Sequence, residues 1–460
     1  MISDWVLLVL KSIASKKVGP TFASRWLFIL TQIIYDGYQY GTGGGRNIDM
    51  FPLSYNDKYV NNIETWMNMV CDLACELVIN NIGDTYIPLE YKKNKIDIDF
   101  SAWASRANTY INNRNTDGWI ESKTISGTIP NQNQDIPVST PGIPILENYD
   151  NWTSLFIDSK KQSYLTPEWG NVTGTVTNSE LSTLLGYAYN YYPKSEIDWD
   201  IETGNVLDIY NNLNDKQRMS AEFWAGGPGS VTPPGFWFIF AYCMLKSKSM
   251  DLHFEVKTYT LLGMGVFQAG ICAWKLKREK LQARPIQRIR YLNSGSIWMP
   301  YQESSFVTPP FPDFVSGHST FSSTCSRILY KVFKNQSIDL DTIIIESDNL
   351  KLLSPSLFST TDNNIMNLSQ INILPGKSTV ILDKTTPLSG CKIGWASLDD
   401  MADDAGNSRI YGGIHVESSN QAGLSMGREI ASLLCNKYKS VLDFVYSPSA
   451  SSGFRVYKNV

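Results

Sequence analysis

Histidine and cysteine are scarce in this sequence, and the scarcity narrows the possible chemistry. Only three histidines occur in 460 residues. The seven cysteines are scattered and odd in number, which is typical of buried or free thiols in a reducing compartment rather than of a disulfide framework. Cys71 and Cys75 are one helical turn apart, but no histidine or second cysteine pair nearby completes a zinc site.

Long apolar runs and a basic excess are also lacking. No stretch reaches the ~18 uninterrupted apolar residues of a membrane-spanning helix. Residues 5–10 are apolar, but this run is too short for a span and too acidic in front for a secretory signal. The net charge is −4, so no basic surface indicates nucleic-acid binding. We therefore expect a soluble, cytoplasmic protein with no signal peptide, no membrane span and no nucleic-acid partner.

Helical periodicity dominates what is present. The chain is 43% hydrophobic, enough for one large core or two closely packed ones. Apolar residues recur at helical spacing in many segments: residues 3–16, 21–40, 61–82, 100–113, 196–213, 215–224, 236–246, 254–274, 397–405 and 421–437. The pattern predicts a mainly α fold with an N-terminal helical half, residues 1–245, and a C-terminal helical half, residues 246–460.

Two segments depart from the helical pattern. Residues 114–177 are rich in Asn, Thr, Pro and Gly, and we expect long ordered loops that lie over the helices. Residues 338–383 contain two short apolar runs, at 342–346 and 379–383, with turn residues between them. They predict a small β insertion near 338–383.

The stretch from 308 to 323 combines a rigid approach with a helix start. Three prolines at 309, 310 and 312 keep the approach extended, because proline fixes φ and lacks a backbone donor. Ser316, Gly317 and His318 follow, and then a run without Pro or Gly that can be helical. A helix N-terminus with free amides is a natural anion site.

Two further stretches supply cations. Lys277 and Arg284 are seven residues apart, so on one helix ended by Pro285 both would point the same way. A basic run that complements a helix dipole is the simpler interpretation of that stretch alone. Arg409 and His415 add a third cation and a second imidazole, although a glycine-rich turn with a satisfied core histidine would look the same.

Together the three stretches suit an oxyanion of tetrahedral or trigonal-bipyramidal shape. A guanidinium group can donate hydrogen bonds to two oxygens of the anion, and lysine adds a point charge. An amide and a hydroxyl can donate to the remaining lone pairs of the oxygens. One imidazole can bond the central atom while the other moves protons. The third histidine, His253, is expected to be structural or exposed.

The order Lys-x6-Arg-Pro, Ser-Gly-His and Ser-Arg-x3-Gly-x-His resembles the vanadium-dependent haloperoxidase and type 2 phosphatidic acid phosphatase superfamily. Flanking segments such as Phe223-Trp-Ala-Gly-Gly-Pro-Gly are similar to its soluble haloperoxidase branch. The resemblance implies a double four-helix-bundle fold. It also implies seven site residues: Lys277, Arg284, Ser316, Gly317 and Arg409 around vanadate or phosphate, His415 as axial vanadium ligand, and His318 as general acid and base, with Lys277 also catalytic.

Three functions remain open at this point. The first is oxidation of a halide by hydrogen peroxide at vanadate. The second is a phosphatase for phosphate esters, in which His415 attacks phosphorus and His318 protonates the leaving group. The third is a catalytically inactive member of the fold. The flanking similarity favours the first. A separate alternative is a terpene synthase, but the aspartate run at 399–404 is only weakly similar to the magnesium motif of those enzymes.

Two positions depart from the branch that the chain resembles. Gly226 stands where relatives often carry Asp, and Phe236 stands where they often carry His. An aspartate at 226 could pair with Arg409. We therefore expect Arg409 to be held less firmly, or by another carboxylate.

Overall fold

The computed structural model describes residues 1–43, 60–334, 336, 339–355, 357, 366–380, 385–442, 445–447 and 455–457. The fold is mainly helical, as predicted. The α-helices are α1 Ile2–Ser15, α2 Pro20–Gly41, α3 Ile63–Ile82, α4 Phe100–Asn113, α5 Asn178–Tyr189, α6 Glu196–Asn211, α7 Asp215–Phe223, α8 Thr232–Ser247, α9 Leu252–Lys280, α10 Pro285–Leu292, α11 Gly317–Phe333, α12 Ser347–Leu353, α13 Leu398–Tyr411, α14 Glu417–Lys437 and α15 Lys439–Leu442. The 3-10 helices are η1 Arg114–Thr116, η2 Glu121–Lys123, η3 Trp169–Asn171 and η4 Leu340–Thr342.

The strands are short and lie in small separate sheets. Their bounds are β1 Asp135–Pro137, β2 Ser154–Ile157, β3 Lys160–Lys161, β4 Ile344–Ile345, β5 Met366–Asn367, β6 Ile371–Ile373, β7 Cys391–Ile393, β8 Val445–Ser447 and β9 Arg455–Tyr457. The first three strands form one sheet in which β2 pairs parallel with β1 and antiparallel with β3. The others pair in sequence order as antiparallel ribbons.

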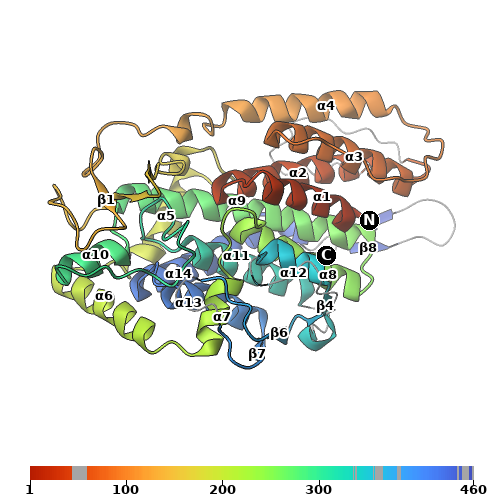
Figure 1. Ribbon diagram of the computed structural model, residues 1–460. Helices are drawn as coiled ribbons and strands as arrows, with labels where there is room; N and C mark the ends of the chain where they lie inside the picture. The colour runs from red at the N-terminus through yellow and green to blue at the C-terminus, as the bar shows by residue number, and fades with distance from the viewer. Residues whose placement is uncertain are drawn as a thin grey trace.

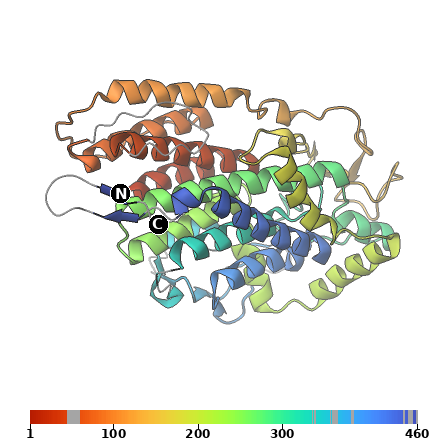
Figure 2. The same ribbon diagram turned by 180° about the vertical axis from the view of Figure 1, so that it is seen from behind.

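The long helix α9 runs through the middle of the molecule (Figure 1). Helices α1 to α4 lie on one side of it, and α11, α13 and α14 lie on the other, which the view from behind also shows (Figure 2). Helix α9 packs against α2 on the first side and against α11 and α14 on the second. Its apolar residues point in all directions, as expected of a helix that two layers cover.

The helices on the C-terminal side of α9 bring the motif stretches together. Helix α11 begins directly after Ser316, and α14 begins two residues after His415. These two helices pack closely, because glycines of α14 face the backbone of α11. A Cβ on Gly423 would lie 2.7 Å from the Ser316 carbonyl oxygen, and one on Gly427 would lie 2.6 Å from the Thr320 carbonyl oxygen. Small residues on α14 therefore set the distance between the Ser-Gly-His stretch and His415.

Segment 114–177 is poor in regular secondary structure. It contains only η1, η2, η3 and the three-stranded sheet, and its residues are joined to the helical body by buried polar contacts. Arg25 on α2 donates from Nε to Asp117 Oδ2 at 2.9 Å, and Arg278 on α9 donates from Nε to Glu168 Oε1 at 2.9 Å. These two ion pairs thus hold the loop segment against α2 and α9.

The small β insertion is confirmed in kind, with different strands. The first predicted run contains β4, which pairs with β5. In the second, residues 379 and 380 are not in a strand, and residues 381–383 lie outside the described part, as do 337 and 338. The insertion also contains helix α12, and its last strand, β7, lies beyond residue 383.

Several helix ends were predicted wrongly, and one of these errors affects the site. Helix α9 ends at Lys280, where Leu281 adopts a left-handed conformation without the glycine that usually marks such an end. Pro285 begins α10 instead of ending α9, because a first-turn proline gives up no helical hydrogen bond. Lys277 and Arg284 are therefore not on one helix. The prolines at 233 and 234 likewise lie in the first turn of α8.

Within the described residues, no helix is both long and apolar enough to span a bilayer. The largest hydrophobic core contains residues from Ile2 to Val441 and so draws on both halves of the chain. The division at residue 245 stays a prediction.

The α11–α14 contact yields a prediction about stability. Gly427→Ala should lower the free energy of unfolding by about 3 kcal/mol, because the methyl group would overlap the α11 backbone. Gly204→Ala on α6 is the matched control, since a Cβ there meets nothing within 4 Å, and it should stabilise by about 0.5–1 kcal/mol. Urea denaturation measures both, and equal effects of the two substitutions would contradict the close packing.

Candidate functional site

His415 lies buried in the loop between α13 and α14, and its neighbours fix the position of its proton. Arg284 Nη1 lies 3.1 Å from His415 Nε2. A guanidinium group can only donate, so Nε2 is the acceptor and carries no proton. Nδ1 then carries the proton and donates it to Asp313 Oδ1. The Asp313 carboxylate thereby fixes the tautomer in which Nε2 offers a lone pair.

Arg284 ties two loops of the site together. It is the N-cap residue of α10, and its side chain is buried. Its Nε donates to the Phe311 carbonyl at 2.8 Å, and its Nη1 also donates to the Ile414 carbonyl at 2.6 Å. Nη2 is buried without a hydrogen-bond partner among the described residues. Burial lowers the pKa of Arg284 to about 10, against the nearby Asp313 carboxylate, so the group remains charged at neutral pH.

Arg409 lies near the end of α13 and is fully buried. Its Nε donates to Ser408 Oγ at 2.9 Å and its Nη2 to the Ala221 carbonyl at 2.5 Å. Nη1 is the second buried guanidinium nitrogen here without a partner among the described residues. Burial lowers the pKa of Arg409 to about 9, and the charge of Asp404 opposes that shift.

The contacts of Arg409 show what holds its side chain when residue 226 is glycine. A backbone carbonyl in the last turn of α7 takes the direct hydrogen bond, and this is the negative end of the helix dipole. Asp404 supplies charge from nearby, while its own oxygens accept hydrogen bonds from Ser220 and from two tryptophans. Arg409 is therefore held by a carbonyl and a hydroxyl, and a carboxylate contributes at longer range.

Gly226 and Phe236, the two positions that depart from the branch that the chain resembles, lie close to each other. Gly226 has a φ of +60°, which favours glycine. A Cβ at this position would lie 3.1 Å from His318 Nε2 and 3.2 Å from Phe236 Cζ. The ring of Phe236 therefore leaves little room for an aspartate at 226.

Ser316, Gly317 and His318 form the N-terminus of α11, as predicted. Ser316 is the N-cap residue, and its hydroxyl accepts from the Ser319 amide at 3.3 Å. The Gly317 amide is at the first helical position, where no intrahelical acceptor exists. His318 Nε2 donates to the Trp224 carbonyl at 2.7 Å, so Nδ1 is its unprotonated nitrogen. Burial, and then the charge of Arg409, lowers the pKa of His318 well below its usual value.

Lys277 takes a different place from the one that the sequence suggested. Its ammonium is buried under the 312–315 loop and donates to three carbonyls, at 2.8 Å to Pro312, 2.9 Å to Asp313 and 2.6 Å to Val315. Three acceptors use all three protons of a charged ammonium, so none is left for a ligand. Burial lowers the pKa of Lys277, whereas the three acceptors favour the charged form.

The structure thus brings together all seven predicted residues, and it adds residues that the sequence reasoning missed. Asp313 stands three residues before Ser316, and its place in the same proline-rich loop was the available signal. Ser419 Oγ lies 3.1 Å from His415 Nδ1, one helical turn further along α14. Asp313 lies inside the 308–323 stretch, whereas Ser419 lies four residues beyond His415, the last residue of the motifs.

Comparisons with known proteins concern the fold of the chain. Residues 257–443 match the family described as VCPO second helical-bundle domain. Three solved structures share the fold over nearly the whole chain. A holo-type bacterial vanadium-dependent chloroperoxidase has a TM-score of 0.63 at 14% identity and covers 92% of this chain and 93% of its own. A bacterial vanadium-dependent iodoperoxidase has a TM-score of 0.61 at 17% identity, and the match covers 94% of this chain and 95% of that one. An apo-type bacterial vanadium-dependent chloroperoxidase has a TM-score of 0.64 at 14% identity, and the match covers 92% of this chain and 96% of that one.

The chain has the vanadium haloperoxidase fold. The predicted resemblance to this superfamily is confirmed by the matched domain, which carries all seven site residues, and by the fold of the whole chain. No curated protein sequence matches the chain.

The residues of this haloperoxidase-like site fit a tetrahedral oxyanion such as vanadate or phosphate. Arg284 and Arg409 each keep one buried N–H-bearing nitrogen without a partner among the described residues, and such groups are costly to bury unless a ligand accepts from them. Three cations are buried here, and Asp313, buried beside Lys277 and Arg284, is a single carboxylate. The excess positive charge and the acceptor-free amide of Gly317 match the lone pairs of an anion.

A further carboxylate reaches the site from α6. Ser418, at the start of α14, donates to Glu202 Oε2 at 2.5 Å. Burial raises the pKa of Glu202 to about 7, and the negative charge of Asp313 adds to that shift. Nothing in the sequence indicates this residue, because its significance comes only from the packing of α6 on α14.

Substitution of Lys277 should reveal its role in holding the loop. Lys277→Met leaves three carbonyls without their donor, so the free energy of unfolding should fall by about 4 kcal/mol. Lys275→Met on the same helix removes one exposed hydrogen bond, to Asn171, and should cost less than about 1 kcal/mol. Chemical denaturation compares the two variants. A Lys277→Met protein as stable as the control would show that the ammonium does not hold the loop.

Glu202 should make stability depend on pH. Its pKa is raised on folding, so its contribution is fully present below about pH 4.5 and is lost as the pH rises through about 7. Glu202→Gln keeps an acceptor for Ser418 but cannot ionise. It should exceed the wild type in stability by about 1 kcal/mol at pH 8, after allowance for solvent access, and match it near pH 4.5. Thermal denaturation at the two pH values measures the difference, and a pH-independent difference would count against the shift.

Proposed function

We propose that this protein is a vanadium-dependent haloperoxidase, which oxidises a halide with hydrogen peroxide. The observation that supports this most is the geometry at His415. Its unprotonated Nε2 is presented next to two guanidinium groups that keep unpartnered nitrogens, within the fold of known chloroperoxidases and an iodoperoxidase. A lone pair beside unpaired buried donors suits a group that is both a metal centre and an oxyanion.

In this proposal the site residues divide into those that contact vanadate and those that position them. Arg284, Arg409, Ser316 and Gly317 hold its oxygens, and His415 Nε2 is the vanadium ligand. Bound vanadate supplies Lewis-acid activation of hydrogen peroxide toward attack by a halide. Lys277 acts through the loop that it holds and through its charge, which contributes to the lowered pKa of His415.

The overall reaction requires one proton, and the chain offers a place for it. Hydrogen peroxide, halide and one proton give hypohalous acid and water. His318 donates from Nε2 to the Trp224 carbonyl and keeps Nδ1 free to take up or release a proton. Its lowered pKa leaves the ring neutral at pH 7, so it begins the cycle as a base.

A phosphatase is the second candidate, and the same observation favours it. A neutral imidazole with a carboxylate behind Nδ1 is also the arrangement of a nucleophile for phosphorus. His415 would attack a phosphate ester in the arginine-lined site, and His318 would protonate the leaving group. A five-coordinate vanadate and the transition state of phosphoryl transfer have the same shape, so one site suits both reactions.

Paired assays distinguish the candidates. We expect bromination of a diketone dye by the full-length protein in the presence of orthovanadate, hydrogen peroxide and bromide. His415→Ala should reduce the rate by at least about 100-fold, because it removes the vanadium ligand. His253→Gln is the matched control: the residue lies on α9 outside the site, and the variant should keep most of the activity.

The complementary assay follows cleavage of p-nitrophenyl phosphate without vanadate. Ester cleavage that vanadate inhibits, together with no bromination, would move the protein to the phosphatase reaction. Neither activity, in protein with a cooperative unfolding transition, would leave an inactive member of the fold.

A further inference from the structure

A largely apolar cavity of about 240 Å³ leads to the two site histidines. Its walls come from the α1–α2 turn, the 225–228 loop, the start of α8, the proline-rich approach to α11 and the loop before α14. Most of its lining side chains are aromatic, aliphatic or proline: Val18, Pro20, Leu165, Pro228, Pro233, Trp274, Phe306, Pro309, Pro310, Phe311, Phe321 and Ile414. Halide ions and hydrogen peroxide do not need such walls.

The size of the cavity limits what it can hold. An apolar protein cavity of roughly 150 Å³ accommodates benzene, and drug-sized ligands occupy roughly 300–1,000 Å³. A volume of about 240 Å³ therefore suits a single substituted aromatic ring. The rings of Trp274 and Phe311 lie next to each other in the wall, with centroids 4.8 Å apart, and offer aromatic surface to such a ligand.

The exposed part of the cavity lining carries a charge. Lys17 lies in the turn between α1 and α2 and lines the cavity together with Val18 and Gly19. It is exposed, and its ammonium has no hydrogen-bond or ion-pair partner within the described residues. Among the described residues, no carboxylate lines this cavity. A ligand that reaches from the histidines to Lys17 gains from an acidic group at its outer end.

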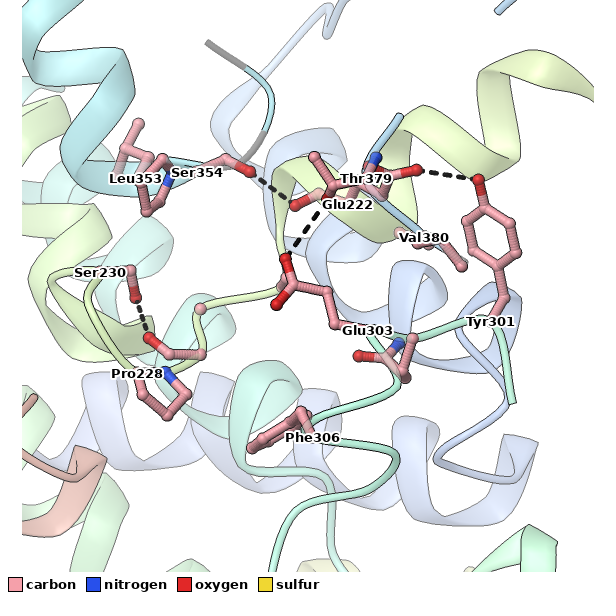
Figure 3. A pocket seen from close by; sticks show the side chains of 16 residues that line it. Glu222, Pro228, Ser230, Tyr301, Glu303, Phe306, Leu353, Ser354, Thr379 and Val380 are labelled. Carbon is pink, nitrogen blue, oxygen red and sulfur yellow. Dashed lines mark hydrogen bonds between the residues drawn. The ribbon is translucent and has the colours of Figure 1, made fainter. Parts of the chain in front are cut away.

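A second hollow on the other side of the 225–228 loop has the opposite character. It measures about 90 Å³ and is the pocket of Figure 3, in which Glu303 points toward the middle. Glu303 accepts from Thr379 Oγ1 at 3.3 Å, and buried Glu222 accepts from Tyr301 and Thr379. Two carboxylates disfavour an anion there. Of these two hollows, the apolar cavity is therefore the one that suits an anionic ligand.

We propose that this cavity is a binding site for an organic substrate, a single-ring aromatic acid whose ring lies near His318 and His415 and whose carboxylate lies near Lys17. The inference rests on the proposed haloperoxidase function for the reaction and on the cavity alone for the binding. Hypohalous acid formed at the site exchanges its halogen for a ring proton of the bound molecule, and water is released. The halogenation would then be selective for the bound acid.

Isothermal titration of the full-length protein, with and without orthovanadate, tests the binding. The probes are 3-(4-hydroxyphenyl)propionate and the matching alcohol, 3-(4-hydroxyphenyl)propan-1-ol. We expect the acid to bind about fivefold more tightly than the alcohol, as one partly exposed ion pair allows. Lys17→Met should remove that advantage and leave binding of the alcohol unchanged.

Two further variants sharpen the test. Lys16→Met is the matched control, because Lys16 pairs with Asp84 and does not line the cavity, so the acid should keep its advantage. Val18→Trp should fill the mouth and abolish binding of both probes. If Val18→Trp does not fold, the comparison of Lys17→Met with Lys16→Met still decides the question.

The outcomes separate this inference from the proposed function. No binding by the wild type, or an advantage of the acid that survives Lys17→Met, would overturn the binding site. Binding with the expected pattern but without vanadate-dependent bromination would keep the site and refute the haloperoxidase. Bromination without binding of the acid would keep the haloperoxidase function and refute the binding site.

Discussion

The burial of three cations around two neutral imidazoles is the constraint on which the site depends. Lys277, Arg284 and Arg409 are all buried. Asp313 partly offsets the charges of the first two, and Asp404 partly offsets that of Arg409. Like charges in a poorly solvated place repel, so each needs local compensation. Backbone carbonyls provide most of it: those of Phe311 and Ile414 for Arg284, that of Ala221 for Arg409, and three for Lys277.

The same hydrogen bonds assemble the loops. Arg284 connects the approach to α11 with the loop before α14, and Arg409 connects α13 with the end of α7. The site loops are thus held by the charges that would bind an anion. An anion that completes the coordination of Arg284 and Arg409 binds the folded state only and therefore stabilises the protein as its concentration rises above its dissociation constant. Ligand affinity and loop order are linked in this way.

The sequence predicted the components of the site better than their roles. Helical periodicity gave the helices, because apolar spacing is decided locally, and the motifs gave all seven residues that the fold brings together. The function of Lys277 could not be predicted, because its partners are backbone carbonyls. Every residue has such a carbonyl, so the amino-acid sequence does not show which ones a lysine will contact. The end of α9 was missed for a related reason: Leu281 adopts a left-handed conformation that glycine usually marks.

Asp313 and Gly226 show two further limits of sequence reasoning. Asp313 was visible in the motif loop, but its role follows only from the contact with His415 Nδ1 across 102 positions of the chain. Gly226 is a departure from the pattern of the branch, and the sequence predicts either a weaker hold on Arg409 or another carboxylate in its place. The structure instead gives Arg409 the Ala221 carbonyl. A contact with the backbone can replace a carboxylate without any change in the residues that a pattern records.

The absence of a side chain at 226 has a consequence of its own. Gly226 lines both hollows, and its neighbours His318 and Phe236 lie on the two sides of the position that a Cβ would take. A carboxylate there would place a negative charge in the wall of the apolar cavity, beside His318. With glycine at 226 and phenylalanine at 236, no carboxylate lines the cavity among the described residues, and Lys17 is the one lysine or arginine of their lining. The two departures thus leave the cavity wall without an anion-repelling group at this position, which favours the approach of an organic anion and a halide under the proposed function.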